Sequence, residues 1–247
     1  MYGPNEIPKI RGTISYYGHQ CPDFTPQKLL DILSKYDFFP ANYVCSPVLT
    51  KGRFVKYRDQ FDRCFQDTFE NPEAGYISLL GAESIRSNRL WDISWYPVKP
   101  SFFDGNTDYT WNTLFFDATY DHMEDANFCN RFLNCFQELI ALLHPFYATI
   151  EDIALSVRLN TTRNGRVVPM TYGKVRSIYW GNYFGPDYCK SYDLNPKLAK
   201  LMRKKYAPSV INEIADGIYI TLTTSPMDYD TDECWKKRTK LMHRMGI

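Results

Sequence analysis

The pattern of apolar and polar positions is clearest in residues 174–224, where it predicts a strand, a helix and a hairpin in succession. β-Branched and aromatic residues fill the first segment, which is typical of a half-buried strand, and Gly185-Pro186 ends it. Residues 196–205 then place leucine and methionine at helical spacing among lysines and arginines. Asp216-Gly217 is a hairpin signal, and residues 218–223 alternate between apolar and polar. The stretch therefore predicts a βαββ unit.

Shorter segments with strand and helix patterns precede this unit. Thr25 followed by Pro26 marks a helix start, and apolar residues at helical spacing continue to Tyr36. A second helical pattern covers residues 54–69. Strands are predicted at residues 9–17, 42–49, 75–80, 90–96 and 113–120. Because the last three of these strands are short and closely spaced, while a parallel crossover needs about a dozen residues, antiparallel pairing is favoured for them.

The longest predicted helix covers residues 121–143, where apolar side chains recur at three- and four-residue steps. Its start is acidic, because Glu124 and Asp125 follow Asp117 and Asp121. The helix dipole favours negative charge at this end. Helix capping explains the acidic residues, and contact with a partner is the alternative.

Two more segments complete the chain. After the helix, residues 146–157 are predicted to be extended, and a terminal helix covers residues 231–245. Three aspartates at or before the start of that helix, Asp228, Asp230 and Asp232, are spaced like the start of a calcium-binding loop. The glycine and the glutamate of such a loop are missing, so these aspartates are expected to cap the helix. The exposed face of the terminal helix is predicted to hold Lys236, Lys237, Arg238, Lys240 and Arg244. Trp180 and Phe132 are predicted core residues.

Length and composition favour one large domain or two tightly packed halves. A chain of 247 residues with 44% hydrophobic content can bury a core without a metal or disulfide. We therefore predict an α+β fold over residues 1–247, a single domain with a predominantly antiparallel mixed sheet and packed amphipathic helices. Seven cysteines fit buried free thiols in a reducing compartment. Because no signal peptide and no apolar run of about 20 residues is present, a cytoplasmic protein without membrane contact is expected.

Charge and motifs argue against catalysis and against nucleic acid. Residues 1–150 hold 13 basic and 18 acidic residues, a balance of −5, and residues 151–247 hold 16 and 10, a balance of +6. The basic helix faces do not amount to a nucleic-acid module, because the net charge is only +1. No Gly-x-Ser-x-Gly, His-Glu-x-x-His, phosphate-loop or Rossmann pattern occurs. His19 and Cys21 lack a second ligand pair, so no metal and no cofactor is predicted.

The order of elements carries a family resemblance. Short strands and a long amphipathic helix are followed by the aromatic strand at residues 179–186, a basic helix, and a hairpin ending in residues 217–223. In this order the chain, mainly over residues 75–225, resembles the immunity proteins of bacterial polymorphic toxin and type VI secretion systems. Such proteins bind a cognate toxin, often a nuclease, and block its active site or substrate path in the cytosol. The resemblance implies a protein without catalytic residues whose partner is a cognate protein toxin.

The predicted binding surface combines acidic charge with the aromatic loop at residues 97–106. An inhibitor of a nuclease must face a basic groove, where acidic residues steer association and aromatic residues anchor the complex. We therefore predict partner contacts at Phe102, Phe103, Asp104, Asp117, Asp121, Glu124 and Asp125. Two alternatives stay open: an enzyme acting through acidic residues, and a phage or mobile-element accessory protein that binds a host factor.

Overall fold

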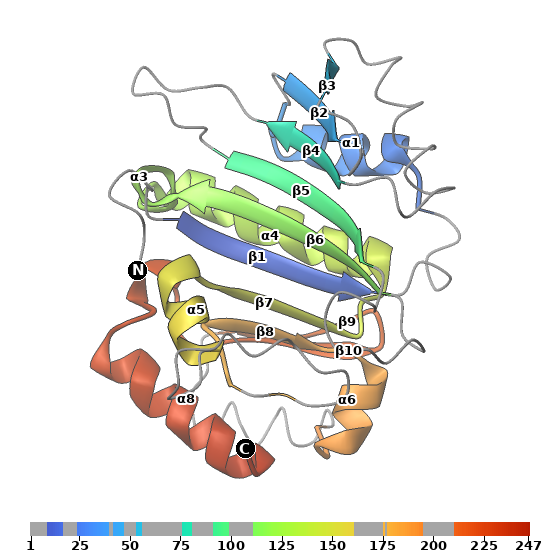
Figure 1. Ribbon diagram of the computed structural model, residues 1–247. Coiled ribbons are helices and arrows are strands. Elements are labelled where there is room, and N and C mark those ends of the chain that lie inside the picture. The colour runs from blue at the N-terminus through green and yellow to red at the C-terminus, as the bar shows by residue number, and fades with distance from the viewer. Residues whose placement is uncertain are drawn as a thin grey trace. The chain divides into compact units, whose positions relative to one another are not determined.

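The chain divides into two compact units, Thr13–His144 and a second unit formed by Met1–Gly12 with Pro145–Ile247. The boundary between the two units falls within strand β1 (Lys9–Tyr16), between Gly12 and Thr13. The computed structural model describes residues 9–16, 24–39, 42–46, 53–55, 76–80, 91–98, 111–160, 175, 177–194 and 210–247. Helices and strands both occur in each unit (Figure 1).

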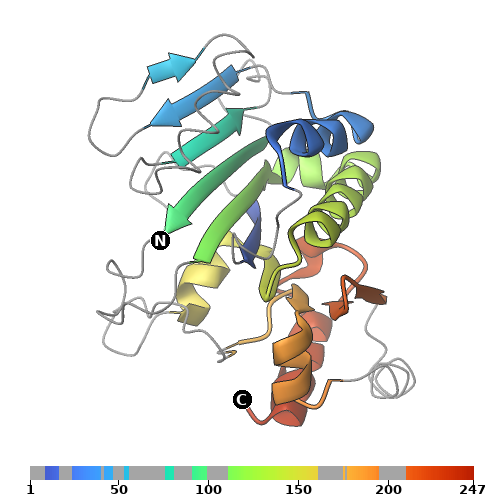
Figure 2. The ribbon, with the colours of Figure 1, turned by 90° about the vertical axis from the view of Figure 1, so that its right-hand side faces the viewer.

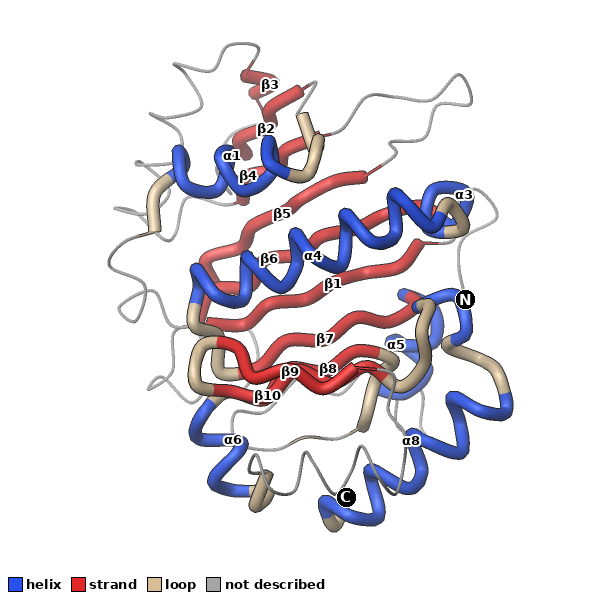
Figure 3. Tube along the Cα trace, turned by 180° about the vertical axis from the view of Figure 1, so that it is seen from behind, coloured by secondary structure: helices blue, strands red, loops and turns tan. Residues whose placement is uncertain are grey.

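Antiparallel strands and two long helices build the unit Thr13–His144. Its strands are paired in the order β3-β2-β4-β5-β6. Helices α1 and α4 lie on one face of these strands (Figures 2 and 3). The elements are β2 (Asn42–Ser46), β3 (Arg53–Val55), β4 (Tyr76–Leu80), β5 (Trp91–Val98), β6 (Trp111–Thr119), α1 (Pro26–Lys35), α3 (Tyr120–Met123) and α4 (Ala126–Leu143).

Aromatic side chains fill the space between these helices and strands. Phe38, next to the end of α1, meets Trp91, Phe116 and Phe128 edge to face, with ring centroids 5.2–5.5 Å apart. Such edge-to-face pairs add about 0.5–1.5 kcal/mol beyond the area they bury. Phe132 is fully buried, which confirms the prediction of a core residue there. The apolar face of α4 is therefore held against the sheet by interlocking rings.

Two predictions for this unit differ from the structure. The helix expected over residues 121–143 is two helices, because Asp125 has an extended backbone (φ −71°, ψ 112°) that ends α3 and caps α4. The helix expected from residue 54 is wrong at its start, since Arg53–Val55 forms strand β3. Residues 56–69 of that prediction lie outside the described part of the chain.

The second unit is built around four antiparallel strands in the order β7-β8-β10-β9. Helix α6 contacts β8 and β10, and a short 3-10 helix, η3, contacts β7. The elements are β7 (Tyr147–Asp152), α5 (Ile153–Asn160), β8 (Gly181–Phe184), α6 (Pro186–Ser191), β9 (Val210–Ile214), β10 (Gly217–Thr221), η3 (Pro226–Asp228) and α8 (Asp232–Met245).

The hairpin of this unit turns one residue earlier than predicted. Its two-residue loop is Ala215 and Asp216, both with positive φ (47° and 61°), and Gly217 already belongs to β10. A Cβ atom at Gly217 would collide with the Phe184 carbonyl oxygen and the Tyr183 ring, so close packing requires glycine there. The predicted hairpin is confirmed, with a shifted turn.

Two predicted strands are also shorter than expected. The extended segment at residues 146–157 ends at Asp152, whose Oδ1 accepts a hydrogen bond (2.7 Å) from the Leu155 N–H and so starts α5. Within the aromatic segment, only Gly181–Phe184 is a strand. The helix predicted at residues 196–205 lies outside the described residues.

The terminal helix and the fold class are confirmed. Thr231 caps α8 by accepting from the Cys234 N–H (3.3 Å), and Gly246 ends it with φ 71°. Asp228 forms a capping box with Ser225 at η3, so it caps this short helix and not the terminal helix, where capping was predicted. The chain is an α+β protein with antiparallel strand pairing. The prediction of one domain over residues 1–247 stays a prediction.

Trp180 is fully buried, as predicted, and its Nε1 donates a 2.6 Å hydrogen bond to Thr223 Oγ1. Trp180→Ala is expected to lower the free energy of unfolding by about 3–5 kcal/mol, because it opens a cavity in the core. Trp180→Phe keeps a ring but loses the hydrogen bond, so a smaller loss is expected. Chemical denaturation measures both, with Phe39→Ala as the control, since Phe39 is 62% exposed. Equal, small losses in all three variants would contradict the core assignment.

Candidate functional site

The predicted contact residues fall into three groups in the structure. Asp121, Glu124 and Asp125 are exposed, at α3 and at the junction of α3 with α4, and we call these three the acidic surface. Asp117 is only 3% exposed within β6, so its carboxylate is not part of that surface. The remaining three predicted residues, Phe102, Phe103 and Asp104, lie outside the described residues.

Within the acidic surface, one carboxylate has a structural role. Asp125 accepts a 2.9 Å hydrogen bond from the Asn127 N–H and caps α4. Nearby, Thr119 Oγ1 lies 3.0 Å from His122 Nδ1, which holds the histidine against α3. Asp121 and Glu124 form no ion pair with another residue that the structure describes. Capping therefore explains Asp125, whereas the other two carboxylates are exposed and have no partner among the described residues.

The capping role of Asp125 predicts a specific pair of results. Asp125→Ala is expected to lower the free energy of unfolding by about 1 kcal/mol, because the Asn127 N–H loses its acceptor. Asp125→Asn is expected to leave stability nearly unchanged, since asparagine caps helices as well as aspartate. Thermal unfolding of both variants measures this. Equal destabilisation by both would show that the charge, and not the cap, matters at this position.

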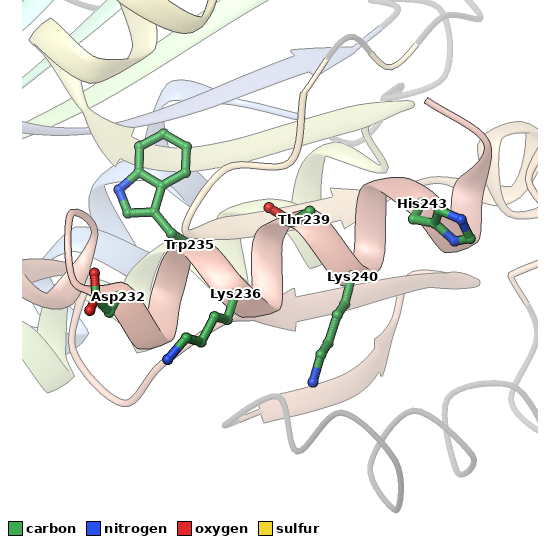
Figure 4. Close-up of a pocket in the computed structure, with 6 residues that line it drawn as sticks. All are labelled: Asp232, Trp235, Lys236, Thr239, Lys240 and His243. Carbon is green, nitrogen blue, oxygen red and sulfur yellow. The ribbon is translucent and has the colours of Figure 1, made fainter.

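The second unit contains a hollow along the outer side of α8. It has a volume of about 620 Å³, and among the described residues it is lined by Asp232, Trp235, Lys236, Thr239, Lys240 and His243. We call it the outer hollow of α8. Lys236 and Lys240 extend to the same side of the helix, and Trp235 points to the opposite side (Figure 4). The sequence predicted the basic residues of this face, but gave no sign that they border a hollow.

Arg238 anchors α8 to the rest of its unit. The predicted exposure of Arg238 is wrong, because the side chain is 1% exposed. Its Nε donates to the Ile178 carbonyl oxygen (2.7 Å), and its Nη2 pairs with Glu151 Oε2. The guanidinium also lies over the Trp235 ring, 4.4 Å from its centroid. The spacing of Arg238 with Cys234, Leu241 and Met245 places it on the buried side of the helix.

Glu151 joins three elements through its carboxylate. Besides Arg238, it accepts hydrogen bonds from the backbone N–H groups of Trp180 and Asp152, each at 3.0 Å. Burial raises the pKa of Glu151 to about 7, and Arg238 together with the two N–H groups opposes the rise. The carboxylate thus links β7 to the irregular segment before β8, and Arg238 links both to α8.

Arg238→Met is expected to show how much this ion pair contributes. Without Arg238 the pKa of Glu151 rises further, so the folded variant keeps its proton above pH 7, where the folded wild-type chain loses it. A carboxyl group whose pKa is higher in the folded than in the unfolded chain favours the folded state fully below the unfolded pKa. This contribution to stability is lost as the pH rises through the folded pKa. The variant should therefore lose more stability near pH 8.5, about 3–5 kcal/mol, than near pH 5.5.

Denaturation at both pH values measures this difference, and Arg244→Met serves as the control because Arg244 is exposed on the same helix. A loss that does not grow with pH would show that Arg238 does not act on Glu151.

Two kinds of reactive group bear on catalysis among the described residues, metal ligands and nucleophilic thiols. Among them no group of three histidine, cysteine or acidic side chains is placed to hold a metal ion. Burial raises the pKa of the Cys129, Cys189 and Cys234 thiols to about 11, so these thiols are protonated near neutral pH and poorly nucleophilic. In the described part of the chain, no helix is long and apolar enough to cross a bilayer.

Comparison with known proteins identifies a structural relative. No protein family and no curated protein matches this chain in sequence. A solved structure with a similar fold is the Pseudomonas aeruginosa T6SS protein PA0821, with a TM-score of 0.66 and 13% sequence identity. The match covers 99% of this chain and 75% of that chain. At this identity the likeness concerns the fold.

Proposed function

We propose that this chain is an immunity protein associated with a type VI secretion system, which binds a cognate toxin and occludes its active site. The observation that carries the proposal is the fold likeness to a T6SS protein, which extends over 99% of the chain. The order of strands, helix and hairpin in the sequence supports it independently, because it resembles immunity proteins. In this proposal the chain acts in the cytoplasm by binding alone, without catalysis or cofactor.

The acidic surface supports the kind of partner proposed. Asp121 and Glu124 are exposed and have no partner among the described residues. Carboxylates so placed attract a basic surface over a distance of about one Debye length, roughly 8–10 Å at physiological salt. A toxin that acts on nucleic acid must have such a basic surface at its active site. A nuclease is therefore the toxin class that this surface fits best.

Co-expression tests the proposal directly. The toxin encoded beside this gene should kill cells that lack this protein, and cells that carry it should survive. Purified toxin and chain should also form a complex by size-exclusion chromatography. If protected and unprotected cells die equally fast, the proposed immunity function is wrong.

Charge reversal locates the toxin-binding surface. Asp121→Lys and Glu124→Lys are each expected to slow association with the toxin by about two- to tenfold and to weaken its salt dependence, while dissociation changes less. The matched control is Glu213→Lys, which makes the same charge change at an exposed position of β9. Stopped-flow or surface plasmon resonance measures the rates. If Glu213→Lys slows association as much as the other two variants, only net charge matters and the acidic surface is not the contact.

A further inference from the structure

The basic residues of α8 divide into two groups by their partners. Lys237 pairs with Glu233 (2.7 Å) and Arg238 pairs with Glu151, so both charges are balanced. Lys236, Lys240 and Arg244 are exposed, and none forms an ion pair with a residue that the structure describes. The cations without a partner therefore all lie on the solvent side of the helix, where the outer hollow is.

The charges that line the outer hollow follow the helical repeat. Asp232, Lys236 and Lys240 are four residues apart, and with a rise of 1.5 Å per residue they lie about 6 Å apart along the helix axis. Figure 4 shows the two lysines extended to the same side. The hollow thus presents one negative charge and then two positive charges, one helical turn from each other.

Trp235 borders the hollow on the side of the helix opposite to the two lysines (Figure 4). The Trp235 ring and the methylene stems of the lysines line the hollow together with Thr239. The charged groups of an occupant can therefore meet Lys236 and Lys240, and its remaining surface faces Thr239 and the lysine stems.

We propose that the outer hollow of α8 binds an acidic helical segment of a protein partner, with two carboxylates one turn apart opposite Lys236 and Lys240. The lining distinguishes this ligand from nucleic acid. A phosphate backbone is negative along its whole length and would be repelled by Asp232, whereas a peptide helix can place a cation there. The inference goes beyond the proposed function, because it concerns a surface of opposite charge and does not depend on the identity of a toxin.

The probe is a fluorescein-labelled helical peptide with two glutamates one turn apart and a lysine one turn further, titrated with the purified full chain by fluorescence anisotropy. Lys236→Glu and Lys240→Glu are each expected to weaken binding about tenfold, and the difference should shrink as salt is added. Thr239→Trp should also weaken binding, because it fills the hollow without changing the charge. Lys190→Glu, the same charge change at an exposed position of α6, should have no effect.

A thymidine oligonucleotide of equal charge distinguishes the two ligand classes, and melting temperatures verify that each variant is folded. Peptide binding that is lost in Lys236→Glu, Lys240→Glu and Thr239→Trp, and kept in Lys190→Glu, supports the inference. Three results would each overturn it: tighter binding of the oligonucleotide than of the peptide, no binding of either, or equal weakening by Lys190→Glu. Because the assay needs no toxin, its failure is separate from a failure of the co-expression test.

Discussion

The buried ion pair of Arg238 with Glu151 is the interaction on which the arrangement of the second unit depends. Burying each of these charges costs several kcal/mol, and the cost is offset only when their remaining hydrogen-bonding groups are also satisfied. Here the carboxylate accepts from two backbone N–H groups and the guanidinium donates through Nε to the Ile178 carbonyl oxygen, whereas Arg238 Nη1 is buried without a hydrogen-bond partner among the described residues, so the cost is offset in part. The pair therefore fixes the backbone between Ile178 and Trp180, which is not part of a strand, and it positions α8.

The unit Thr13–His144 is held together by a different kind of contact. There the side chains around Phe38 are aromatic, and the end of α1 is joined to α4 by polar contacts, including the part-buried 2.8 Å hydrogen bond from the Tyr36 hydroxyl to Glu138. Arg131 lies over the Phe38 and Phe128 rings, 5.8 and 5.7 Å from their centroids, and pairs with Asp37. Shape complementarity between rings, and not buried charge, thus holds α4 on its strands.

Elements with strong periodicity could be predicted from the sequence, and elements that depend on one distant contact could not. The apolar repeat of α4 and the Thr25 cap of α1 are local, so their positions followed from the sequence. The hairpin turn lies one residue before the predicted turn because Gly217 belongs to β10 and packs against Tyr183, and no local sequence pattern reveals this contact. Arg238 was placed on the wrong face because its charge was given more weight than its helical spacing, and its partner Glu151 is 87 residues away in the chain.

The candidate site was harder to predict for a related reason. Asp117, Asp121 and Asp125 are alike in the sequence, yet one is buried, one is exposed and one is a helix cap. A fold can be retained at 13% identity because it depends mainly on the apolar pattern and on side-chain volume, which many sequences satisfy. Exposed charges such as Glu124 and Lys240 are not bound by that constraint and are free to change with a partner. Residues that bind a partner are therefore best sought among exposed charges that have no partner in the described part of the chain, and the acidic surface and the outer hollow of α8 contain such charges.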